Sequence, residues 1–73
     1  MPQFEVVREG AYSDVQRVRA RTAEAAVQAV LDDPIASLSL KPPDDYGWRD
    51  AELAGAVVAR VREHATRMRF RRE

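Results

Sequence analysis

Two rows of alternating arginines are the residues of this chain best suited to binding chemistry. The rows are Arg17, Arg19 and Arg21, and Arg67, Arg69 and Arg71. Alternate residues of a β-strand share one face at a spacing of about 6.6 Å, so each row would place three guanidinium groups together. Guanidinium groups bind carboxylates and phosphates through paired hydrogen bonds. The rows therefore predict a surface for an anionic partner, with a solvated outer sheet face as the alternative.

Acidic and aromatic residues offer a second candidate surface. The acidic pairs are Asp32–Asp33 and Asp44–Asp45, and the aromatic residues that follow the second pair are Tyr46 and Trp48. Neither pair has the ligand spacing of a cation-binding loop, so we expect turn acids and no metal site. The acids could instead mimic nucleic acid in a basic channel. Tryptophan and tyrosine are typical of interface hot spots, but we expect Trp48 to cap the open end of the core.

Catalytic residue types are scarce in this chain. It has one histidine, His64, and no cysteine, and its three glycines are too scattered to form a phosphate-binding loop. None of its serines lies in a nucleophile-elbow pattern. His64 has no recognisable partner, so we expect it on the surface or in a loop. These features predict a non-enzymatic protein without cofactor or metal.

Length and composition indicate one small domain that spans residues 1–73. Of the 73 residues, 45% are hydrophobic, and 12 basic residues balance 12 acidic ones. A net charge of zero argues against a general attraction to nucleic acid. The lack of cysteine and of a long apolar run indicates a cytoplasmic protein with no membrane span. The opening residues, MPQFEVV, lack the pattern of a signal peptide, and we expect none.

The N-terminal third predicts a hairpin, with strands over Gln3–Arg8 and Val15–Arg21 and a turn between them. The apolar residues that must share the buried face are Phe4, Val6, Val18 and Ala20. One register that satisfies this condition places Val6 opposite Val18. It also places Glu5 opposite Arg19 on the outer face, where opposite charges attract.

Helical spacing of alanine and valine follows directly and predicts a helix over Thr22–Leu31, with Thr22 as its N-cap. Acids at a helix C-terminus are unfavourable, so we expect the helix to end before Asp32 and Asp33. Leucine and serine alternate next, which indicates a short third strand at about 36–41.

Residues after Trp48 fit two interpretations. Apolar spacing and composition favour a second helix at Asp50–His64 and a last strand at Arg67–Arg71, giving the order ββαβαβ. Alternation around Ala59 and a change of apolar parity favour a hairpin instead, with its turn near 63–66 and the order ββαβββ. Both orders belong to the α+β class, with an antiparallel sheet and a helix packed on one face.

The segments FEVVREG, VQRVRART and AEAAVQAVL follow the order strand, strand, helix over roughly residues 3–31. This order resembles that of small ββα proteins from phages and mobile elements, among them anti-restriction-like and anti-CRISPR proteins. The resemblance implies a compact, cofactor-free inhibitor of a host nuclease complex. Such families share no motif, so no functional residue is carried over.

We therefore expect a non-enzymatic binding protein that blocks a nucleoprotein complex, such as a CRISPR effector, sterically and electrostatically. The alternative is a nucleic-acid-binding or antitoxin-like module that uses an arginine-rich sheet face. The oligomeric state does not follow from these patterns.

Overall fold

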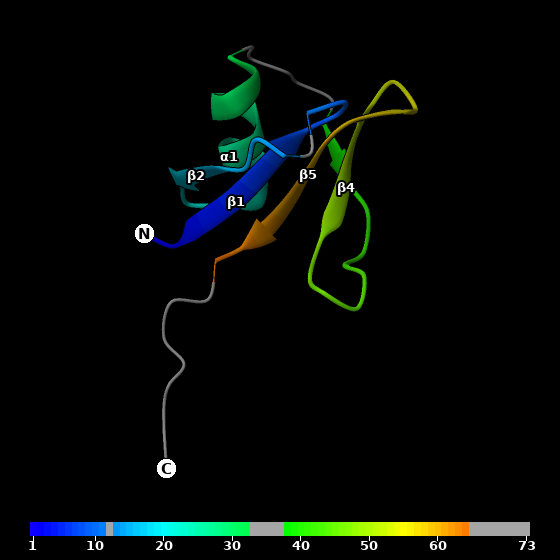
Figure 1. Cartoon of the computed structure of the whole chain (residues 1–73). Helices are drawn as coiled ribbons and strands as arrows, with labels where there is room; N and C mark the ends of the chain where they lie inside the picture. Colours follow the sequence, from blue (N-terminus) through cyan, green and yellow to red (C-terminus); the bar gives the residue numbers. More distant parts are fainter. Residues whose placement is uncertain (12, 33–37, 65–73) are drawn as a thin grey trace.

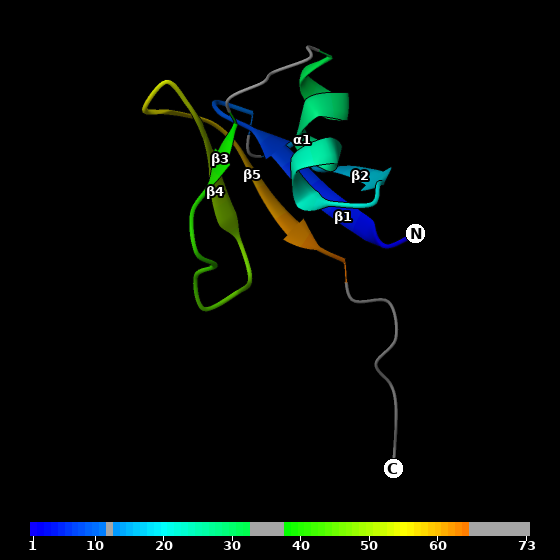
Figure 2. The ribbon, with the colours of Figure 1, turned by 180° about the vertical axis from the view of Figure 1, so that it is seen from behind.

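The computed structural model describes residues 1–11, 13–32 and 38–64, which form an α+β domain with one antiparallel sheet and one helix (Figures 1 and 2). The elements are β1 (Gln3–Arg8), β2 (Gln16–Arg19), α1 (Ala23–Leu31), β3 (Ser39–Leu40), β4 (Arg49–Leu53) and β5 (Ala56–Glu63). Their order across the sheet is β2-β1-β5-β4-β3, so β2 and β3 are the edge strands. No helix in the described ranges is long and apolar enough to cross a membrane.

The β1–β2 hairpin confirms the expected faces but not the expected register. Phe4 lies opposite Val18, and Glu5 lies opposite Arg17 instead of Arg19. The true register is displaced by two residues, which leaves every side chain on its expected face. Apolar alternation determines only which side chains share a face, and not which residues are paired. The loop between the two strands determines the pairing. Two successive tight turns form this loop, in which Ala11 N–H donates to Arg8 O and Asp14 N–H donates to Ala11 O.

The helix begins where the sequence predicts. The Thr22 side chain accepts a hydrogen bond from Ala25 N–H at 3.1 Å, which confirms Thr22 as the N-cap. The helix ends at Leu31, and Asp32 adopts the left-handed conformation with φ 56° as its C-cap. Asp33 and the first part of the expected third strand lie outside the described residues, and β3 spans only Ser39–Leu40.

The predicted second helix at Asp50–His64 is wrong, because β4 and β5 form an antiparallel hairpin there. The chain reverses at Ala54 and Gly55, both with positive φ, so the glycine that would weaken a helix belongs to a turn. The alternative order ββαβββ is therefore correct, although its turn is not near 63–66. The predicted strand Arg67–Arg71 lies outside the described residues.

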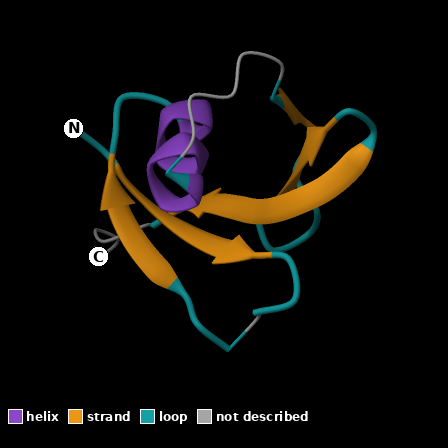
Figure 3. Ribbon diagram, turned by 90° about the horizontal axis from the view of Figure 1, so that it is seen from above, coloured by secondary structure: helices purple, strands orange, loops and turns teal. Residues whose placement is uncertain are grey.

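The core lies between α1 and one face of the sheet, as Figure 3 shows from above. Its largest fully buried side chains are Val6, Val27 and Val61, which come from β1, α1 and β5. Alanines fill much of the rest, so the helix can lie close to the strands. Phe4 and Ala20 are buried in the same cluster, as expected.

Candidate binding face

The sheet face turned away from α1, here called the outer face, carries most of the charged side chains of the described strands. Glu5 lies between the core residues Phe4 and Val6 and therefore points to the outer face. The residues paired with Glu5 across the ladder are Arg17 on β2 and Arg62 on β5, and directly paired residues share a face. Acidic and basic side chains thus meet on three adjacent strands.

Three ion pairs link neighbouring segments on this face. Arg62 Nε lies 2.6 Å from Glu5 Oε1 and joins β5 to β1. Arg60 Nε lies 3.1 Å from Asp50 Oδ1 and joins β5 to β4. Beyond them, Lys41 Nζ lies 3.8 Å from Glu52 Oε1, which is a looser contact. The outer face over β5, β4 and the end of β3 is therefore close to charge balance.

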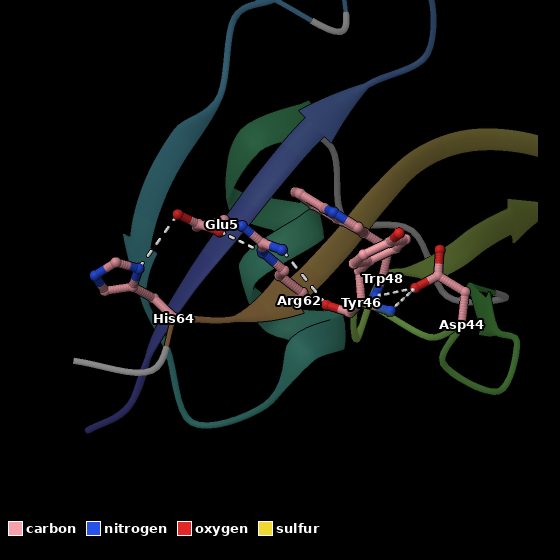
Figure 4. A network of polar contacts seen from close by, with 6 residues as sticks. All are labelled: Glu5, Asp44, Tyr46, Trp48, Arg62 and His64. Carbon is pink, nitrogen blue, oxygen red and sulfur yellow. Dashed lines mark hydrogen bonds and ion pairs between the residues drawn. The ribbon is translucent and has the colours of Figure 1, made fainter. Parts of the chain in front are cut away.

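Glu5 is the centre of the best-formed network (Figure 4). Its side chain is 12% exposed, and besides Arg62 it lies 3.2 Å from Nδ1 of His64. The hydrogen bond from Arg62 lowers the pKa of the Glu5 carboxyl below its ordinary value of 4.5. Burial alone would raise that pKa, but the charge of Arg62 and the contact with His64 reinforce the lowering. Because an ionised carboxylate only accepts hydrogen bonds, His64 Nδ1 carries the hydrogen.

His64 thus has the partner that the sequence did not reveal. Its backbone N–H also donates to Gln3 O at 2.8 Å, which holds the end of β5 against β1. Glu5 and His64 are 59 residues apart in the chain and meet only because β5 pairs with β1. The alternation of Val61 with Arg60 and Arg62 could have indicated a strand at this position. The prediction of a helix over the same residues did not take account of it.

A loop stabilised by Asp44 brings aromatic residues to the same face. Asp44 Oδ1 accepts hydrogen bonds from the backbone N–H groups of Tyr46 and Trp48 at 2.8 and 2.9 Å. The guanidinium of Arg62 lies 4.5 Å from the centroid of the Trp48 ring, which is a cation–π contact. Arg62 also donates to Tyr46 O at 3.4 Å (Figure 4). These contacts fix the loop on the Glu5 network.

Trp48 therefore does not cap the core, because it lies on the outer face and is not part of the cluster beneath α1. It lines an open pocket of about 230 Å³ with Val7, Val15 and Arg60. Val7 is buried although it belongs to the outer face. The lining of the pocket is thus mixed, with apolar side chains beside an arginine. Tyr46 is 78% exposed and lines a second open pocket with Glu5 and Arg62.

The predicted acidic sites differ in what they can offer a partner. One oxygen of the Asp44 carboxylate, Oδ1, accepts two backbone hydrogen bonds of its own loop. Asp45 is exposed in that loop. No group of three or more His, Asp or Glu residues in the described ranges could hold a metal ion.

The first arginine row behaves differently from the other outer-face cations. Arg17, Arg19 and Arg21 are exposed, and none of them makes a side-chain hydrogen bond or ion pair with another described residue. Arg17 lies opposite Glu5 in the ladder, but that carboxylate contacts Arg62 and His64. The second row, Arg67, Arg69 and Arg71, lies outside the described residues.

Comparisons with protein-family models, with curated proteins and with solved structures found no match to this chain. The resemblance to small phage proteins therefore stays a prediction, and the site is interpreted from its own geometry.

Proposed function

We propose that this chain is a non-enzymatic binding protein that binds an anionic macromolecule through Arg17, Arg19 and Arg21, here called the arginine row. One contrast carries the proposal. Lys41, Arg60 and Arg62 on the same face each contact an acid, whereas the described structure supplies none to the arginine row. The positive charge of the outer face is thus concentrated along β2.

The geometry of the row suits an anionic partner. Arg17 and Arg19 lie on one face of β2, about 6.6 Å apart, and like charges at this spacing repel each other. An anion bound between them relieves this repulsion and gains charge-assisted hydrogen bonds. Since both side chains are exposed, binding needs no rearrangement of the core.

Inhibition of a nucleoprotein complex is the biological setting that we propose for this binding, as the resemblance to small phage proteins implies. A protein of this size can act by covering a surface of the complex. Contact through the arginine row is favoured over contact through the acidic loop, because the Asp44 carboxylate already accepts two backbone hydrogen bonds.

A second candidate function is direct binding of single-stranded nucleic acid. The observation that favours it is the position of Trp48 on the arginine-bearing face, with a pocket between Trp48 and Val7. Aromatic rings and arginines on one sheet surface are typical of proteins that stack and hold bases. The acids of the same face oppose it, since Glu5 and Asp50 would repel phosphate.

Fluorescence anisotropy with labelled polyglutamate and labelled single-stranded DNA and RNA, at low and moderate salt, tests both functions. We expect Arg17→Gln with Arg19→Gln to weaken binding by about tenfold or more, since two contacts of about 1 kcal/mol each are lost. The matched control, Arg8→Gln with Lys41→Gln, removes the same charge from exposed positions outside the arginine row and should bind much more like the wild type. Failure of every probe to bind at low salt would refute the proposal.

A further inference from the structure

The edge of β2 has the features of a peptide-binding strand. β2 is the first strand in the order β2-β1-β5-β4-β3, so only one of its sides is paired among the described residues. It is four residues long, whereas the opposite edge strand β3 has only two. An unpaired edge presents backbone N–H and C=O groups that can accept a further strand.

The hydrogen-bond pattern identifies which backbone groups face outward. Ala20 N–H donates to Pro2 O at 3.2 Å, so these two residues form a hydrogen-bonded pair of the β1–β2 ladder. Hydrogen-bonded pairs recur at every second residue of an antiparallel ladder. The backbone groups of Val18 and Gln16 therefore also bond to β1. The backbone N–H and C=O groups of Arg17 and Arg19 therefore point away from β1.

The guanidinium groups of the same two residues contact no acid within the described ranges of the chain. A chain laid along β2 would meet outward backbone groups and guanidinium groups at the same alternate positions. We infer that the β2 edge binds an extended acidic peptide as an additional strand, with carboxylates at every second residue facing Arg17 and Arg19. This inference rests on the proposed function and specifies the class of its partner.

A second copy of this chain is a poor occupant of the edge. Antiparallel pairing of two β2 strands about a two-fold axis at Val18 places Arg17 directly opposite Arg19 of the other copy. A two-fold axis at Arg17 places this residue directly opposite Arg17 of the other copy. Like charges directly opposite destabilise a strand pair, so the row that attracts an acidic strand also repels a copy.

A nucleic-acid backbone matches the edge less well than a peptide does. A DNA backbone offers hydrogen-bond acceptors but no donors for the outward C=O groups of Arg17 and Arg19, and an RNA backbone adds only the 2′-OH as a donor. A peptide strand supplies both kinds of group at the strand repeat. Alternate glutamate or aspartate side chains would then lie on the outer face, at the spacing of the arginines.

The test uses a capped synthetic peptide of about ten residues that alternates threonine and glutamate, measured by anisotropy against the full chain. In an antiparallel register with a glutamate directly opposite Arg17, glutamate N–H groups face β2 and threonine N–H groups face solvent. We therefore expect N-methylation of the glutamates to weaken binding at least about tenfold and N-methylation of the threonines to have little effect. Bound peptide should also slow hydrogen exchange of the Arg17 and Arg19 amides.

The outcomes separate this inference from the proposed function. If both N-methylated peptides bind as well as the parent, attraction is only electrostatic, and strand addition is refuted while the proposed function stands. Binding of single-stranded DNA or RNA without binding of the peptide also refutes it, in favour of nucleic acid. If no anionic probe binds at low salt, both proposals fail. Loss of peptide binding in Arg17→Gln with Arg19→Gln, but not in Arg8→Gln with Lys41→Gln, supports the assigned edge.

Discussion

Substitution of Glu5 by glutamine tests whether the outer-face network stabilises the fold. The change keeps the shape of the side chain but removes the charge that Arg62 contacts at 2.6 Å and His64 at 3.2 Å. Hydrogen bonds to a charged group contribute about 1.5–3 kcal/mol each. Because the Arg62 side chain is 36% exposed, solvent screening reduces this figure. We therefore expect Glu5→Gln to lower the free energy of unfolding by about 1–2 kcal/mol.

Thermal unfolding followed by circular dichroism at neutral pH measures this loss. For a domain of this size, a loss of about 1–2 kcal/mol lowers Tm by about 5–15 °C. The matched control is Glu52→Gln, whose carboxylate contacts Lys41 at 3.8 Å with that lysine 54% exposed. This control should change stability by less than about 0.5 kcal/mol. A double-mutant cycle with Arg62→Gln should give a coupling energy above about 0.5 kcal/mol.

The pH dependence of stability provides an independent check. The pKa of Glu5 is lowered in the folded protein from its ordinary value of 4.5, so its contribution is full above pH 4.5. That contribution is lost as the pH falls through the folded pKa. The wild type should therefore lose its advantage over Glu5→Gln in acid, and the two stability curves should converge. Equal effects of Glu5→Gln and Glu52→Gln at neutral pH, or parallel curves down to low pH, would refute the reasoning.

Three further predictions test local features by the same thermal assay. Thr22→Ala removes the hydroxyl that accepts from Ala25 N–H and should cost about 1 kcal/mol; an unchanged Tm would mean that the cap is not needed. Ala54→Asn should stabilise by about 0.5–1 kcal/mol, because φ of 54° strains alanine and Asn-Gly suits this two-residue turn; a lower Tm would contradict the turn. Asp44→Ala should cost about 1–2 kcal/mol, whereas Asp45→Ala should stay within about 0.5 kcal/mol, and equal effects would contradict the role of Asp44.

The parts of the fold that local pattern specifies were predictable. The strand–strand–helix unit, the buried face of the hairpin and the Thr22 cap all depend on residues within a few positions of each other. The β4–β5 hairpin was harder to predict, because its alanine, arginine and glutamate residues have a high helix propensity. Pairing of β5 with β1 overrides this preference by burying Ala59 and Val61 against α1.

The candidate site shows the same division. Alternation alone predicts that Arg17 and Arg19 share an exposed face of β2, and both are exposed, whereas Arg21 lies beyond the end of that strand. The Glu5–Arg62–His64 network depends on a ladder between residues almost sixty positions apart, which no local pattern encodes. The error over Trp48 comes from the missed β4–β5 hairpin, because the pairing of these strands places Trp48 beside Arg62.

The proposed selection of an anionic partner is compatible with a net charge of zero. The chain has 12 basic and 12 acidic residues, so it exerts little long-range attraction on a polyanion. Ion pairs neutralise the outer face near β5 and β4, and the charge of the arginine row acts over about a Debye length of 8–10 Å. A long nucleic acid placed across the face would also approach Glu5 and Asp50. A narrow acidic strand along the β2 edge contacts the arginine row and lies farther from both acids.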